Sequence, residues 1–214
     1  MQEISKANPE SSAPIPMQSI RSQMHKVRPV LVVLCGPSHA GKSTFGTRLA
    51  RLSDNVAVVS PDDIRRRLGV GFGDPEREPV IWKLYESAKC RALQQGRHVV
   101  LDACHLSEQA RWHALQGPNR RHRKACVMFD VPWRIVRQRA LRTKRVPLGE
   151  VKRMWDAFRA CKPAPDGLRR LGFDDVHVVR GCPASYGWIA RSRDNAGPLV
   201  SGERGERSVD ERTG

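Results

Sequence analysis

The eight residues from Gly36 to Ser43 fit the pattern G-x-x-x-x-G-K-[ST], and Thr44 follows directly. Glycine lets the backbone turn so that several N–H groups face the oxygens of a bound phosphate. The helix expected to begin near Lys42 would point its amino end at the same anion. Lys42 would neutralise the β- and γ-phosphates of ATP or GTP, and the Ser43 hydroxyl would bind Mg²⁺. The residues predicted to bind the nucleotide are Gly36, Pro37, Ser38, His39, Ala40, Gly41, Lys42, Ser43 and Thr44.

A carboxylate and a guanidinium follow the next apolar segment, in Ser60-Pro61-Asp62-Asp63-Ile64-Arg65. Asp62 and Arg65 are three residues apart, so they would share one face of a helix. A carboxylate beside a phosphate site can accept the proton of an attacking hydroxyl group. A guanidinium can bind an acceptor phosphate through two N–H groups. We therefore predict that Asp62 and Arg65 are catalytic and that Asp63 is a surface acid.

A third apolar segment also ends in a carboxylate, in Val99-Val100-Leu101-Asp102. At this position an aspartate commonly holds Mg²⁺ through a water molecule. Asp102 could instead orient Arg65 through an ion pair, and the sequence leaves both roles open. Together with Ser43, Asp102 forms the predicted metal site.

Two arginines lie three residues apart late in a predicted helix, Arg139 and Arg142, and they precede the basic loop 143–147. Arginines on a mobile lid can close over a nucleotide and stabilise the charge of the phosphoryl group in transfer. This pair is therefore the candidate for the lid of the site.

Short apolar runs that alternate with longer helical patterns must position these residues. Such alternation predicts an α/β fold with a parallel sheet flanked by helices, and ligands of such folds bind at the carboxyl ends of the strands. The predicted strands are 30–34, 56–59, 98–101, 124–129 and 176–179, and the predicted helices are 43–52, 62–68, 80–95, 107–115, 132–142 and 147–160.

The predicted domain covers residues 29–180. Residues 1–28 contain Pro, Ser and Gln without an apolar period, so we expect a disordered extension. Residues 181–214 are expected to form a mostly disordered tail. No apolar run is long enough to span a membrane, and no secretory signal is visible near the start, so a cytoplasmic location is expected.

The net charge of the 214-residue chain is +16, and nearly all of it falls in the predicted domain. Residues 120–145 hold ten basic side chains and a single acid, Asp130. A basic excess this concentrated favours a polyanionic partner such as nucleic acid. An arginine-rich composition on a solvated surface is the alternative explanation.

These motifs together resemble the 5′-hydroxyl polynucleotide kinase type of P-loop phosphotransferase, as found in phage and bacterial end-healing enzymes. The similarity covers roughly residues 30–180 and keeps the order of the family's motifs. The segments that carry it are 36–45, 60–65, Leu101-Asp102, His105-Leu106-Ser107, Arg111-Trp112, Phe129-Asp130-Val131-Pro132-Trp133, Arg139 with Arg142, and Val146-Pro147 followed by Val151, Met154 and Trp155.

The resemblance implies a P-loop NTPase fold of the nucleotide-kinase type with a short helical lid, and a kinase that uses ATP and Mg²⁺. Asp62 would be the general base for the acceptor 5′-hydroxyl, Arg65 would bind the acceptor's phosphate, and Asp102 would support Arg65. Arg139 would lie near the nucleotide and Arg142 near its β- and γ-phosphates, which makes Lys42 and Arg142 catalytic as well. The lid is slightly shorter than the family's pattern, so Lys144 or Arg145 could replace Arg142.

The expected partners are ATP and a nucleic acid with a 5′-hydroxyl end. Two alternatives remain open from the sequence. The first is a kinase of a small molecule or a nucleotide sugar, similar to zeta-type toxins, on the same frame. The second is a nucleotide-gated nucleic-acid binding protein without transfer activity. The sequence carries no signal for DNA over RNA or for oligomeric state.

Overall fold

The apolar run that follows Pro29 forms β1 (Val30–Cys35), and all six of its residues are buried. Continuous burial is typical of a parallel strand that is covered on both faces. In the computed structural model, which describes residues 16–24, 28–117 and 122–180, β1 is the central strand of a five-stranded sheet with the order β2-β3-β1-β4-β5. Every pairing is parallel, so the predicted α/β fold class is confirmed. The other strands are β2 (Val56–Val59), β3 (His98–Leu101), β4 (Arg123–Asp130) and β5 (Asp175–Arg180).

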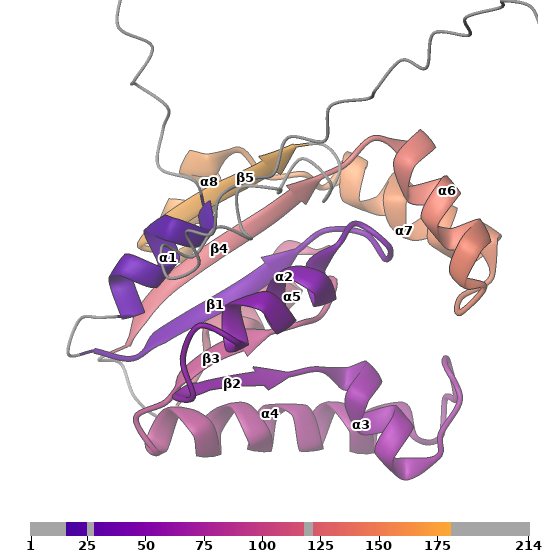
Figure 1. Cartoon of the computed structure of the whole chain (residues 1–214). Coiled ribbons are helices and arrows are strands. Elements are labelled where there is room, and N and C mark those ends of the chain that lie inside the picture. The colour runs from indigo at the N-terminus through magenta and orange to yellow at the C-terminus, as the bar shows by residue number, and fades with distance from the viewer. Residues whose placement is uncertain (1–15, 25–27, 118–121, 181–214) are drawn as a thin grey trace, which may run out of the picture.

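Helices cover both faces of this sheet (Figure 1). On one face, alternate β1 residues such as Val32 pack in a hydrophobic cluster with Ile20, Phe45 and Val136. On the other face, the intervening β1 residues pack against residues of α4, α5 and α8. The helices are α1 (Pro16–Met24), α2 (Lys42–Ala50), α3 (Pro61–Leu68), α4 (Glu78–Gln94), α5 (Glu108–Leu115), α6 (Trp133–Thr143), α7 (Leu148–Ala160) and α8 (Pro165–Leu171).

Two helices lie where no helix was predicted. Residues 1–28 were expected to be disordered, but 16–24 form α1, whose Ile20 is fully buried in a hydrophobic cluster. Among the α1 side chains that the structure describes, Ile20 is the one buried apolar residue, and a single such position gives too weak a period to reveal a helix in the sequence. The short helix α8 begins with Pro165 and ends before Gly172, which has a left-handed backbone. The predictions for residues 1–15 and for the tail 181–214 lie outside the described residues.

The carboxyl ends of β1, β2 and β3 are held together by backbone hydrogen bonds. The N–H of Gly36 donates to the carbonyl of Cys104 at 2.9 Å, and the N–H of Asp102 donates to the carbonyl of Val59 at 2.9 Å. The helix α3 lies on one side of this edge of the sheet, and the pair α6–α7 lies on the other (Figure 1). The three loops that carry the candidate site residues therefore meet at one edge, as the topology requires. Within the described residues, no helix is both long and apolar enough to cross a bilayer.

Candidate active site

The loop between β1 and α2 requires glycine at two positions. Gly36 has φ 146° and Gly41 has φ 108°, values that other residues rarely adopt. A Cβ atom on Gly36 would lie 3.0 Å from both the Cβ and the carbonyl oxygen of Phe129. Gly41 directly precedes α2, so the free N–H groups of the first helical turn point toward the loop. The predicted phosphate-binding loop thus has the backbone that its motif demands.

Lys42 closes this loop from within. Its ammonium group is buried and donates to the carbonyls of Gly36 at 3.0 Å and of Pro37 at 2.7 Å. The same group lies 3.4 Å from the Sγ atom of Cys104. The charge of Lys42 is therefore already at the place where the motif predicts the phosphates of a nucleotide.

His39 connects the loop to the end of α6. Its Nδ1 atom lies 3.0 Å from the hydroxyl of Ser38, and its Nε2 atom lies 2.8 Å from the hydroxyl of Thr143. Burial lowers the pKa of His39, and the positive charges of Lys42 and two arginines, Arg145 and Arg139, lower it further. The imidazole ring of His39 is therefore neutral at pH 7. It joins the phosphate loop to α6 through hydrogen bonds and not through an ion pair.

Asp62 and Arg65 lie on α3, as predicted, and they are paired. Ser60 caps this helix by accepting a hydrogen bond from the N–H of Asp63, and Pro61 occupies the first turn. The Nη1 atom of Arg65 donates to Asp62 at 2.6 Å, while its Nε and Nη2 atoms donate to the two oxygens of Glu78 at 2.9 Å each. Arg65 is buried, whereas the side chain of Asp62 is 73% exposed and open to a substrate.

The carboxylate that orients Arg65 is thus Glu78 at the start of α4, and not Asp102. Burial is the main cause that raises the pKa of Asp102, and the negative charges of Asp62 and Asp63 raise it further. The positive charge of Lys42 and a hydrogen bond with the Ser43 hydroxyl lower the pKa and so oppose this rise. Asp102 therefore lies beside the phosphate loop. Of its two predicted roles, this position supports the metal role, and the predicted support of Arg65 is corrected.

A hydroxyl and one carboxylate are a donor set that fits Mg²⁺ bound to a nucleotide. Mg²⁺ commonly takes only one or two protein ligands, while phosphates and water complete its octahedron. In the described part of the chain, no group of three or more His, Cys, Asp or Glu side chains could hold a metal without a substrate. Ser43 and Asp102 therefore suit an ion that arrives with the nucleotide.

The two lid arginines have different positions. The Nη1 atom of Arg139 donates to the carbonyls of His39 and Ala40, both at 3.0 Å, so this side chain contacts the loop itself. Arg142 is exposed in the last turn of α6 and does not line the cavity, because the helix ends at Thr143 and Lys144 turns the chain with φ 50°. The arginine of the helix pair that does line the cavity beside Arg139 is Arg153 of α7.

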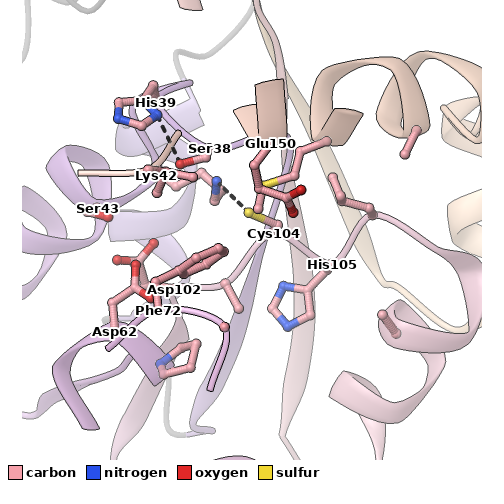
Figure 2. A pocket seen from close by; sticks show the side chains of 18 of the residues that line it. Ser38, His39, Lys42, Ser43, Asp62, Phe72, Asp102, Cys104, His105 and Glu150 are labelled. Atoms are coloured by element: carbon pink, nitrogen blue, oxygen red, sulfur yellow. Dashed lines mark hydrogen bonds between the residues drawn. The ribbon is translucent and has the colours of Figure 1, made fainter. Parts of the chain in front are cut away.

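A single cavity of about 840 Å³ joins these groups. Lys42 and Ser43 line one part of it, and Asp62 lines another (Figure 2). Arg65 lines the cavity as well. Sequence reasoning assigned no site role to several of its residues, because they come from the α3–α4 loop, α4, the β3–α5 loop and α7 and are brought together only by tertiary contacts. These are Phe72, Glu78, Trp82, Cys104, His105, Glu150 and Arg153.

His105 supports the wall of this cavity from inside the protein. Its Nδ1 atom donates to the carbonyl of Leu34 at 2.7 Å, and its Nε2 atom accepts from the hydroxyl of Tyr85 at 3.2 Å. Burial is the main reason that its pKa falls to about 4. Neutral His105 thus fixes the loop that follows Asp102.

A protein-family model described as an AAA domain matches residues 31–161. No curated protein matches the chain. A structural match with a chain of the Pnkp1/Rnl/Hen1 RNA repair complex has a TM-score of 0.55 and 25% identity, and it covers 64% of this chain and 46% of the other. The present chain thus spans less than half of that relative. A second Pnkp1/Rnl/Hen1 structure matches with a TM-score of 0.46 and 27% identity, over 52% of this chain and 39% of that one.

A shikimate kinase from Acinetobacter baumannii, in complex with shikimate, matches with a TM-score of 0.47 and 23% identity, over 79% of this chain and 90% of that one. The family match and the structural match at a TM-score of 0.55 show a P-loop kinase fold. These two findings also confirm the predicted resemblance to P-loop phosphotransferases of the polynucleotide kinase type.

Proposed function

The chain belongs to the AAA domain family, and from this premise we propose that it transfers the γ-phosphoryl group of ATP to the 5′-hydroxyl of DNA or RNA. One observation carries the proposal. The cavity that holds Lys42 and Ser43 of the phosphate loop continues to Asp62 and Arg65, so a nucleotide and an acceptor fit in one continuous cavity. A protein that only binds a nucleotide needs no second part of this kind.

The side chains supply the steps of an in-line transfer. Asp62 accepts the proton of the acceptor hydroxyl, whose oxygen attacks the γ-phosphorus while the bond to the β–γ bridging oxygen breaks and ADP leaves. Lys42 and the loop N–H groups stabilise the charge that develops on the phosphate oxygens. Ser43 and Asp102 would hold Mg²⁺, which would supply positive charge to the phosphates of the nucleotide.

Two observations favour a polynucleotide over a small acceptor. Basic side chains alone supply the charge between Val131 and Gly149, a segment that includes α6 beside the cavity. The structural match with the RNA repair complex chain, at 25% identity, points to the same class of substrate. A phosphorylated small molecule or a nucleotide sugar is the second candidate acceptor, because a cavity of about 840 Å³ also encloses a ligand of that size.

The test is phosphate transfer from γ-labelled ATP to a 5′-hydroxyl oligonucleotide. We expect labelled 5′ ends from the wild type and turnover reduced by orders of magnitude in Asp62→Asn, with ATP binding retained. Asp63→Asn is the matched control, because Asp63 pairs with Arg66 at 2.9 Å and does not line the cavity. Near-normal turnover in Asp62→Asn would remove Asp62 as the base.

Two other outcomes would support the alternative functions. Transfer of the label to small acceptors alone would support the second candidate. Oligonucleotide binding with ATP left intact would support a protein without transfer activity.

A further inference from the structure

The guanidinium group of Arg65 is only partly occupied by its protein partners. Arginine has five N–H donors, one on Nε and two on each terminal nitrogen. Glu78 takes the Nε donor and one on Nη2, and Asp62 takes one on Nη1. One N–H therefore remains on each terminal nitrogen, and this is the number that a phosphate needs for a bidentate contact.

Glu78 is itself held in place from a second direction. Its Oε2 atom also accepts a hydrogen bond from Nε1 of Trp82 at 3.0 Å, one turn further along α4. A carboxylate with three donors is well fixed, so Glu78 restricts the rotation of the buried Arg65 side chain. The two remaining N–H groups thus have a defined direction before any acceptor arrives.

An aromatic ring lies beside this guanidinium. The Cζ atom of Arg65 is 5.6 Å from the centre of the Phe72 ring, and Phe72 remains 48% exposed. Phe72 lines the same cavity as Asp62, and its ring extends into the cavity from the side of Asp62 (Figure 2). Nucleic-acid bases stack on exposed aromatic rings that line a binding groove.

The resemblance to polynucleotide kinases already implies that Arg65 binds the acceptor's phosphate. From this arrangement we propose that Phe72, beside Arg65, forms the stacking subsite for the base of the acceptor's terminal nucleotide, and that Glu78 is the positioning residue that fixes Arg65 for the phosphate next to that nucleoside. The proposal rests on the proposed function and deepens it, because the subsite recognises a base together with a phosphate. A sugar or a small carboxylic acid would use only the arginine.

The experiment compares two 5′-hydroxyl oligonucleotides of equal sequence, one with a normal terminal base and one with an abasic terminal residue. For the wild type we expect the abasic end to raise KM about tenfold, the size typical of one base stacked on an aromatic ring. Phe72→Ala should raise KM for the normal end by a similar factor, leave KM for the abasic end unchanged, and leave KM for ATP unchanged. Trp112→Ala is the matched control, because Trp112 is 47% exposed and lies outside the cavity.

Equal effects of Phe72→Ala on both acceptors, or no effect of base removal on an oligonucleotide that is phosphorylated, would overturn the subsite alone. Failure of the wild type to phosphorylate any oligonucleotide would overturn the proposed function and the subsite with it. The two failures are therefore distinguishable in one assay.

The role of Glu78 is tested with Glu78→Gln, which keeps the shape of the side chain and removes its charge. We expect a rise in KM for the oligonucleotide of at least fivefold, an unchanged KM for ATP, and no further rise when Glu78→Gln is added to Arg65→Ala. Glu76→Gln, at an exposed position in the loop just before α4, is the control. Additive effects of the two changes would show that Glu78 does not act through Arg65.

Discussion

At the scale of single residues, Asp102 lies in unfavourable surroundings for a negative charge. Burial raises its pKa, which means that the folded protein binds this proton more tightly than the unfolded chain does. Above its folded pKa, ionised Asp102 therefore lowers the free energy of unfolding. We expect Asp102→Asn to raise Tm near neutral pH while it abolishes Mg²⁺-dependent transfer.

The gain in Tm should shrink as the pH falls through the pKa of Asp102, because the wild-type carboxyl then becomes neutral as well. Thermal melts over a pH series measure both effects. A lower Tm for Asp102→Asn near neutral pH would contradict the desolvation of this side chain.

His105 makes the free energy of unfolding depend on pH in the opposite direction to Asp102. Its pKa of about 4 in the folded protein is below the ordinary value of 6.5, so the unfolded chain takes up the proton first as the pH falls. As the pH falls from about 7 to about 5, we expect protonation of this residue in the unfolded chain to lower the free energy of unfolding by about 2 kcal/mol. Urea unfolding of the wild type and of His105→Asn measures it, since asparagine tolerates the positive φ of 43° at this position. Equal pH slopes in the two proteins would refute the assignment.

The residues found from the sequence are those whose partners lie within a few positions along the chain. The glycines and Lys42 belong to one continuous motif, and Asp62 and Arg65 share one helical turn. Glu78 is thirteen residues from Arg65 and pairs with it only because the α3–α4 loop returns the chain. Tertiary contacts of this kind leave no period in the sequence. For this reason the orientation of Arg65 by an ion pair, which is the role of Glu78, was assigned to Asp102.

At the scale of elements, α1 contributes to the core although its sequence is mostly polar. Ile20 is fully buried among residues of β1, α2 and β4. We expect Ile20→Ala to lower the free energy of unfolding by about 2–4 kcal/mol, the cost of a cavity left by a large aliphatic side chain. Chemical denaturation gives the value, and an unchanged midpoint would mean that α1 does not pack on the sheet in solution.

The strands and the larger helices could be predicted because burial on two faces leaves continuous apolar runs for strands and long periods for helices. All five strands and six of the eight helices that the structure describes were predicted near their observed bounds. The helices α1 and α8 were missed because, among the side chains that the structure describes, the buried apolar residue is Ile20 in the first and Leu168 in the second.

At the scale of the whole molecule, the excess of basic groups should act on the acceptor more than on ATP. Arg134 and Arg137 are exposed on α6 and form no ion pair among the described residues. For a long oligonucleotide, we expect KM to rise steeply between about 50 mM and about 200 mM salt, because bound polyanions release counterions. Arg134→Gln with Arg137→Gln should flatten that dependence.

The control pair is Arg169→Gln with Arg170→Gln on α8, which removes the same charge away from the cavity (Figure 1). Steady-state kinetics over a salt series compare the variants. Equal flattening by both pairs would show that only the net charge matters, and no salt dependence in the wild type would exclude this surface as a polyanion contact.

A further consequence follows from the alternation of side chains along β1. One strand contributes to the hydrophobic clusters on both faces and then runs directly into the phosphate loop. Neither layer of helices can detach without exposing half of that strand, so the chain should unfold in one cooperative transition. ATP binding should then slow amide hydrogen exchange in helices of both layers together, including those that never touch the nucleotide.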